Sequence, residues 1–159
     1  MTELGDLRFH RLLVAVDGSA HADLALAAAI TTARRDHAAL TLVCVAPDVV
    51  AEAARWPAGL AWPGSQREAD AVAERTLREA VDRVPADIPV RTVMRRGKAG
   101  PHIVAEARSG SYDAILLGAR GLGRVGALAG SVSHHVLHHA DIAVFVAHAP
   151  PGAAAPSAA

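Results

Sequence analysis

The feature that most constrains the fold of this chain is a regular alternation of short apolar runs with longer stretches of helical character. Five runs are short, rich in aliphatic residues and bounded by Gly, Pro or polar residues, as β-strands are. They span residues 12–16, 39–46, 90–95, 113–117 and 142–147. Helices are expected over residues 21–35, 66–84, 101–109 and 131–139. This order predicts an α/β fold, with a doubly wound five-stranded parallel sheet and helices on both faces, as in Rossmann-like proteins.

Four of the five runs, all but residues 90–95, are almost continuously apolar, which predicts strands that are buried on both faces. Residues 47–65 contain the breakers Pro57 and Pro63-Gly64 and are expected to be irregular. The chain therefore reads as one domain over residues 1–148. The Pro/Ala/Gly-rich residues 149–159 are expected to form a disordered tail.

Composition excludes several functional classes. The 16 basic and 16 acidic side chains cancel, which argues against a dedicated partner among nucleic acids or anionic membranes. No apolar run approaches the roughly 20 residues that span a bilayer, and the first residues do not resemble a signal segment, so a cytoplasmic protein is expected. The single cysteine, Cys44, lies in an apolar run and reads as a buried small hydrophobe.

The chemistry of the chain concentrates in a glycine-rich segment, residues 118–133, between the fourth strand and the last helix. Glycine lets a ligand approach the main chain closely, and the free amides at a helix start attract phosphate. In doubly wound sheets, ligands lie beyond the carboxyl ends of the strands, where the strand order reverses. Asp17 follows the first strand, so it and the glycine-rich segment would line one crevice if strands one and four are neighbours.

Motif spacing narrows the type of site. A P-loop is absent, because no Gly-Lys-Ser/Thr follows the glycines. Gly121, Gly123 and Gly126 match a dinucleotide fingerprint, but Asp141 precedes the last strand instead of ending it. The match is treated as accidental, and the chain has no room for the substrate domain of an oxidoreductase. At this point a tight turn without a ligand explains the glycines as well as a phosphate site does.

Four segments together resemble the universal stress protein family. They are Leu13-Val14-Ala15-Val16-Asp17-Gly18-Ser19, residues 96–107, residues 112–121 and residues 130–137. The resemblance covers nearly the whole chain and implies a fold like that of the adenine-nucleotide α-hydrolases. Nucleotide-binding members of the family carry Gly, two residues, Gly, nine residues and then Gly-Ser or Gly-Thr. Here Gly118 and Gly121 are followed by eight residues before Gly130-Ser131, one residue fewer.

The resemblance implies ATP as the ligand, with Mg²⁺ as a possible companion, in the crevice between strands one and four. Asp17 would contact the adenosine, the end of the second strand would offer backbone groups to adenine, and the start of the last helix would hold phosphate. The residues expected to bind the nucleotide are Ala15, Val16, Asp17, Ser19, Val43, Cys44, Val45, Gly118, Arg120, Gly121, Gly130, Ser131, Val132 and Ser133.

The family resemblance further implies a nucleotide-responsive stress regulator that forms a homodimer through its last strand. No catalytic residues are expected, because no general base beyond Asp17 is evident, and any hydrolysis of ATP should be slow. The shortened motif keeps an alternative open, in which nucleotide binding has been lost and the chain is a dimeric interaction module of the stress response.

Four histidines of the last predicted helix could in principle bind a metal ion. His134 and His138, like His135 and His139, are four residues apart, a spacing that lets two imidazoles share a metal on a helix. No third ligand is evident in the sequence. We therefore predict no metal site and assign the cluster a structural or pH-sensitive role at an interface.

Overall fold

The computed structural model contains a single five-stranded parallel sheet in the order β3-β2-β1-β4-β5. The structure describes residues 7–55, 57–58, 64–119 and 131–148. The strands are β1 (Arg11–Ala15), β2 (Ala39–Ala46), β3 (Val90–Arg96), β4 (Ala114–Gly118) and β5 (Ala143–Ala147). The predicted doubly wound parallel sheet is confirmed, with strand bounds shifted by a residue or so.

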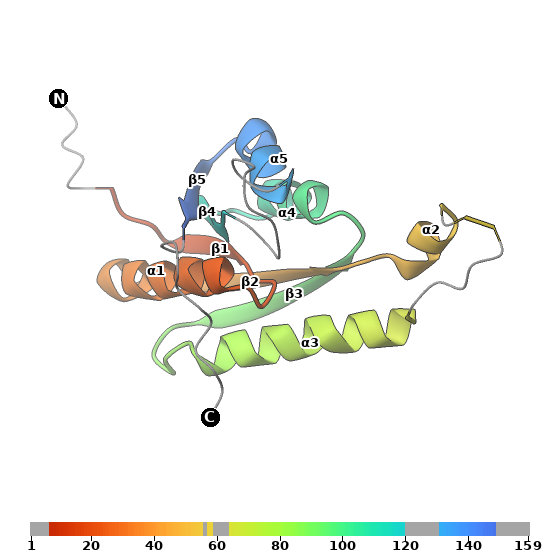
Figure 1. Cartoon of the computed structure of the whole chain (residues 1–159). Coiled ribbons are helices and arrows are strands. Elements are labelled where there is room, and N and C mark those ends of the chain that lie inside the picture. Colours follow the sequence, from red (N-terminus) through yellow and green to blue (C-terminus); the bar gives the residue numbers. More distant parts are fainter. Residues whose placement is uncertain (1–6, 56, 59–63, 120–130, 149–159) are drawn as a thin grey trace.

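Helices cover both faces of this sheet (Figure 1). On one face lie α1 (Ala20–Asp36) and α3 (Gln66–Asp82), and on the other lie α4 (Ala99–Ser109) and α5 (Ser131–His139). Each face has its own apolar core, one formed with α1 and α3 and the other with α4 and α5. Within the described ranges, no helix combines the length and the apolar character needed to cross a membrane.

The two-residue alternation of the strands divides the core between the two faces. Leu12 and Val14 of β1 pack toward α1 and α3, whereas Leu13 packs with residues of α4 and α5. Strand β5 departs from the prediction of burial on both faces. It lies at the edge of the sheet, and Ala143 and Phe145 on it are exposed, Phe145 to 47%. That part of the prediction was wrong because an apolar run does not reveal which strand ends a sheet.

Side-chain caps explain where several helices begin. The Ser19 hydroxyl caps α1, and Ser65 with Glu68 forms a capping box at α3. A short helix, α2 (Val49–Ala53), lies in the segment that was expected to be irregular. The Asp48 side chain accepts a hydrogen bond from the third residue of this helix and so supplies its cap.

Helix α4 is fixed to the sheet by a buried carboxylate. Glu106 is only 6% exposed, and its Oε2 accepts a 2.8 Å hydrogen bond from Arg95 of β3. Its Oε1 accepts a 3.0 Å bond from the Tyr112 hydroxyl, which in turn accepts 2.7 Å from Arg91. Both oxygens of this buried carboxylate therefore accept hydrogen bonds, which compensates for the loss of water around its charge. This network sets the position of α4, whose first turns form one wall of the site described next.

Candidate functional site

The site lies where the strand order reverses, between β1 and β4. Strand β1 pairs in parallel with both β2 and β4, with Val14 opposite Leu116 on the β4 side. The first and fourth strands are therefore neighbours, which the sequence analysis could state only as a condition. After β1 the chain continues into α1 on one face, whereas α5, which follows β4, lies on the other face. In such sheets a crevice opens at this point, beyond the carboxyl ends of the strands.

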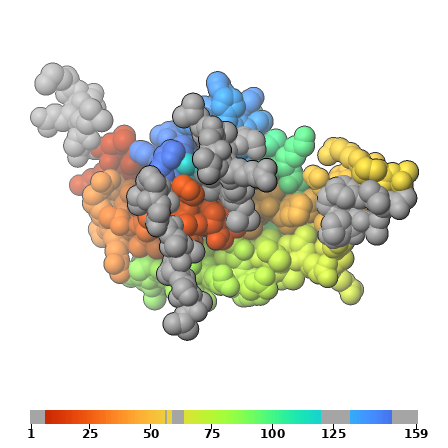
Figure 2. All heavy atoms as spheres, viewed as in Figure 1, coloured from red at the N-terminus to blue at the C-terminus, as the bar shows by residue number. Residues whose placement is uncertain are grey.

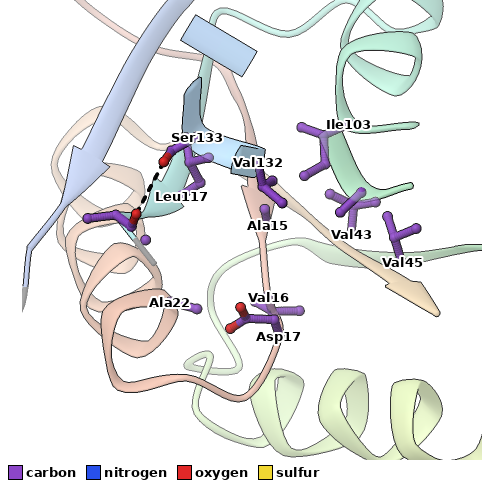
Figure 3. A pocket seen from close by; sticks show the side chains of 13 residues that line it. Ala15, Val16, Asp17, Ala22, Val43, Val45, Ile103, Leu117, Val132 and Ser133 are labelled. Atoms are coloured by element: carbon purple, nitrogen blue, oxygen red, sulfur yellow. Dashed lines mark hydrogen bonds between the residues drawn. The ribbon is translucent and has the colours of Figure 1, made fainter. Parts of the chain in front are cut away.

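A cavity of about 160 Å³ occupies this position (Figure 3). Its lining is mostly apolar, and Asp17 supplies the ionisable side chain among the described lining residues. Eight residues that the sequence pointed to meet here: Ala15, Val16, Asp17, Val43, Val45, Gly118, Val132 and Ser133. A largely apolar cavity with a few directed polar groups is the usual form of a small-molecule site.

The Asp17 carboxylate is oriented by the turn that follows β1. Its Oδ1 accepts a 2.9 Å hydrogen bond from the backbone N–H of Ser19. The turn needs Gly18, whose φ of +79° lies in the left-handed region that favours glycine. Among the described residues, Oδ2 of Asp17 has no hydrogen-bond partner. The carboxylate therefore retains an oxygen that can accept hydrogen bonds from a ligand in the cavity.

The end of the ladder between β1 and β2 exposes backbone groups to the same cavity. The N–H of Val16 donates a 2.9 Å hydrogen bond to the carbonyl of Val43, and the pairing stops there. Backbone groups alternate sides along a strand, and those of Leu40 and Ala46 bond on the β3 side. The backbone N–H and C=O of Val45 consequently point toward the β1 side, at a level beyond the last residue of β1. Within the described part of the chain, these two groups have no backbone partner.

Gly118 forms the end of β4 and contacts the start of α1. A Cβ atom at this position would lie 2.6 Å from the backbone nitrogen of Ala22 and 2.6 Å from the carbonyl carbon of His21. Side chains do not approach backbone atoms so closely, so only glycine fits. The glycine is thus explained by the approach of a helix, in addition to any approach of a ligand.

The first turn of α5 closes the cavity on the side opposite α1. Ser133 is only 1% exposed, and its hydroxyl donates a 3.2 Å hydrogen bond to the carbonyl of Ala119 (Figure 3). This bond ties α5 to the residue that follows β4. Val132 lines the cavity, and Ser131 begins the helix. The amino end of α5 therefore lies beside the cavity.

Other predicted site residues are not brought to the cavity. The Ser19 hydroxyl caps α1 by accepting a 3.2 Å hydrogen bond from Ala22. Cys44 packs on the opposite face of the sheet, where burial, with a smaller effect of the negative charge of Asp17, raises the pKa of its thiol to about 11. Arg120, Gly121 and Gly130 lie outside the described residues.

Five lining residues were missed by the sequence reasoning: Ala22, Ala99, Ile103, Leu117 and Ala119. Two of them had a signal. Ala99 follows the third strand, whose carboxyl end lies on the ligand side of a parallel sheet, and Ile103 is one helical turn further on. The position of Ala22 depends on how α1 crosses β4, which no local pattern reveals.

Comparison with known proteins agrees with this architecture. The sequence model of the universal stress protein family matches residues 8–148. The chain belongs to the universal stress protein family. A universal stress protein of Mycobacterium tuberculosis is 33% identical over 137 residues, which cover 86% of this chain and 44% of that protein. The chain thus spans less than half the length of this curated relative.

Solved structures of the family share the fold. A universal stress protein from Archaeoglobus fulgidus in complex with dAMP matches with a TM-score of 0.65 and 21% identity, over 89% of this chain and 99% of that one. A family protein from Arabidopsis thaliana with AMP bound matches with a TM-score of 0.66 and 17% identity, over 93% and 97% of the two chains. At sequence identities of 21% and 17%, this similarity shows a shared fold.

Proposed function

We propose that this universal stress protein binds ATP in the cavity at the switch point and acts as a cytoplasmic, nucleotide-responsive stress regulator. The observation that carries the proposal is the pair of unpartnered backbone groups of Val45 at the rim of an apolar cavity. Adenine presents a ring acceptor next to an amino donor. A single N–H and C=O pair on one residue can satisfy both, while Val43 and Ile103 provide apolar walls for the ring.

The remaining groups of a nucleotide have complementary partners around the cavity. The free oxygen of Asp17 suits a ribose hydroxyl, since a carboxylate accepts hydrogen bonds strongly. The amino end of α5 suits phosphate, because its first amides lack partners within the helix. Solved relatives that hold dAMP and AMP support the nucleotide class, whereas the triphosphate and Mg²⁺ rest on the family resemblance of residues 118–133.

The test is to extract nucleotide from the purified protein and then titrate the stripped protein calorimetrically with ATP, with and without Mg²⁺, and with AMP. We expect binding of ATP that Asp17→Asn weakens, because asparagine preserves the turn to Ser19 but removes the charge. Asp87→Asn is the matched control, since Asp87 is exposed and precedes β3, at the amino ends of the strands and away from the cavity. Absence of both bound nucleotide and binding heat would favour the dimeric interaction module.

We further propose a homodimer through β5. This strand ends the sheet and leaves Phe145 47% exposed, and an apolar edge strand readily pairs with another chain. Light scattering coupled to gel filtration should give twice the mass of the chain. The variant Phe145→Gln should shift the mass toward the monomer while its circular dichroism stays native. A monomeric wild-type protein at micromolar concentration would contradict this assembly.

A further inference from the structure

The two histidine pairs of α5 have the same sequence spacing but different geometry. The rings of His135 and His139 are stacked, with centroids 4.1 Å apart and planes only 17° from parallel. The rings of His134 and His138 are 4.3 Å apart, and their planes are inclined at 58°. The sequence could not distinguish the two pairs, and on the sequence alone we predicted no metal site. Their surroundings in the structure separate them, and for one pair we depart from that expectation.

The His135–His139 pair is engaged in packing. Nδ1 of His139 lies 2.8 Å from the carbonyl oxygen of His135, so this nitrogen is occupied by the helix backbone. The guanidinium of Arg108 also donates a 2.9 Å hydrogen bond to the carbonyl of His139, which brings a positive charge to this side of the helix. The in-plane lone pairs of nearly parallel rings do not converge on one point. This pair therefore suits the contact between α4 and α5.

The His134–His138 pair is free to act as a chelate. Both residues are exposed, on a helix at the outer surface of the molecule (Figures 1 and 2). Among the described residues, neither side chain has a hydrogen bond or ion pair. The two rings contact each other, and His134 also acts electrostatically on His135. The two rings are 4.3 Å apart and are not stacked, so rotation of these exposed side chains can turn one nitrogen of each ring toward a single ion.

We propose that His134 and His138 bind one divalent late transition-metal ion, of the class of Zn²⁺, Ni²⁺ and Cu²⁺, on the outer face of α5. Imidazole nitrogen is a preferred ligand of these ions, and histidines one helical turn apart can share one ion. In the described ranges, no group of three or more His, Cys, Asp or Glu side chains is close enough together to hold a metal ion. The two imidazoles therefore supply the protein ligands, and water completes the coordination.

The experiment is a calorimetric titration of the untagged protein with Zn²⁺ at pH 7.5. We expect one ion per chain. The single variants His134→Gln and His138→Gln should each lower the affinity at least about tenfold, because even the loss of a residue that hydrogen-bonds to a metal ligand lowers affinity that much. His139→Gln is the matched control on the same helix and should change the affinity less than about twofold. Competition by protons should weaken the binding as the pH falls.

A second readout identifies the ligands independently of affinity. With Cu²⁺ as the probe, electron paramagnetic resonance should show two imidazole nitrogens in the wild type and one in His138→Gln. Circular dichroism should be unchanged in all variants, because both side chains are exposed. Equal affinity in wild type and His138→Gln, or an equal loss in His139→Gln, would overturn the assignment to this pair.

Discussion

Gly118 and Ala22 belong to elements that are far apart in the sequence, yet a Cβ atom on Gly118 would lie 2.6 Å from the backbone nitrogen of Ala22. The end of β4 and the first turn of α1 are therefore in direct backbone contact. This contact holds α1 against the cavity, where Ala22 and Gly118 both form part of the wall.

Replacing Gly118 with alanine should lower the free energy of unfolding by about 1–3 kcal/mol, because the added methyl group forces the helix away from the strand. Urea denaturation followed by circular dichroism measures the change. Gly18→Ala is the comparison variant. Its Cβ would make only an ordinary van der Waals contact, 3.9 Å from Thr76 Oγ1, but its φ of +79° is unfavourable for alanine. A Gly118→Ala protein as stable as the wild type would contradict the contact.

Val45→Pro should weaken ATP binding by up to about tenfold, which corresponds to the loss of one ordinary hydrogen bond. Proline removes the N–H that faces the cavity, and this N–H does not take part in the ladder with β3, so the sheet should persist. Val45→Ala retains the N–H and is the control for loss of the side chain. Equal losses in the two variants, measured by calorimetry, would show that the backbone group does not bind the base.

The stability at acid pH should depend on Asp36 at the end of α1. The Arg35 guanidinium first of all, and also the N–H of Phe9, hold the pKa of Asp36 down at about 2, against the effect of burial. In the unfolded chain the group titrates near 3.9. Between about pH 4 and pH 2 the unfolded chain therefore binds more protons, and the stabilisation is lost as the pH falls. In urea titrations, the stability advantage of wild type over Asp36→Asn should be present at pH 5 and disappear near pH 2.

His135 should make the free energy of unfolding depend on pH near neutrality, well above the range in which Asp36 acts. Burial first, and then the neighbouring His139 and His134, lower the pKa of His135 below its usual value near 6.5. His135 packs closely on α4, because a Cβ added to Gly100 of that helix would lie 2.9 Å from the Cβ of His135. Because protonation favours the unfolded chain, this contribution to stability should be present above pH 6.5 and decline as the pH falls below it. His135→Gln should flatten that decline in thermal melts between pH 7.5 and pH 5, and an unchanged slope would contradict the assignment.

Much of the architecture could be predicted because it depends on local patterns. Aliphatic runs such as residues 39–46 mark strands, and the order of strands and helices restricts the sheet to a few topologies. The pairing of β1 with β4 could be stated only as a condition, since nothing in either strand specifies its neighbour. Helix α2 was missed although Asp48 is a good capping residue, because five residues carry too little periodicity.

The site was predictable to the extent that it depends on strand ends. Asp17 could be placed because it follows a strand, whereas Val45 was expected only from the family resemblance; the structure adds that its backbone groups lie beyond the end of β1. Cys44 could have been set aside on alternation alone, since its neighbours on both sides in the chain face the cavity. The capping role of Ser19 and the helix contact of Gly118 required the three-dimensional structure, because each depends on where α1 lies.

The cavity is assembled from residues 15–22, 43–45, 99–103, 117–119 and 132–133, so no continuous fragment of the chain contains more than a part of it. It exists only when contacts of long sequence separation have all formed, which is late in the folding of a parallel sheet. A molecule that fills it stabilises the native state as a whole, by an amount that rises with the logarithm of its concentration once that concentration exceeds Kd. The supply of that molecule then sets how much of the chain is unfolded and open to proteases, and thus how long the protein persists in a cell.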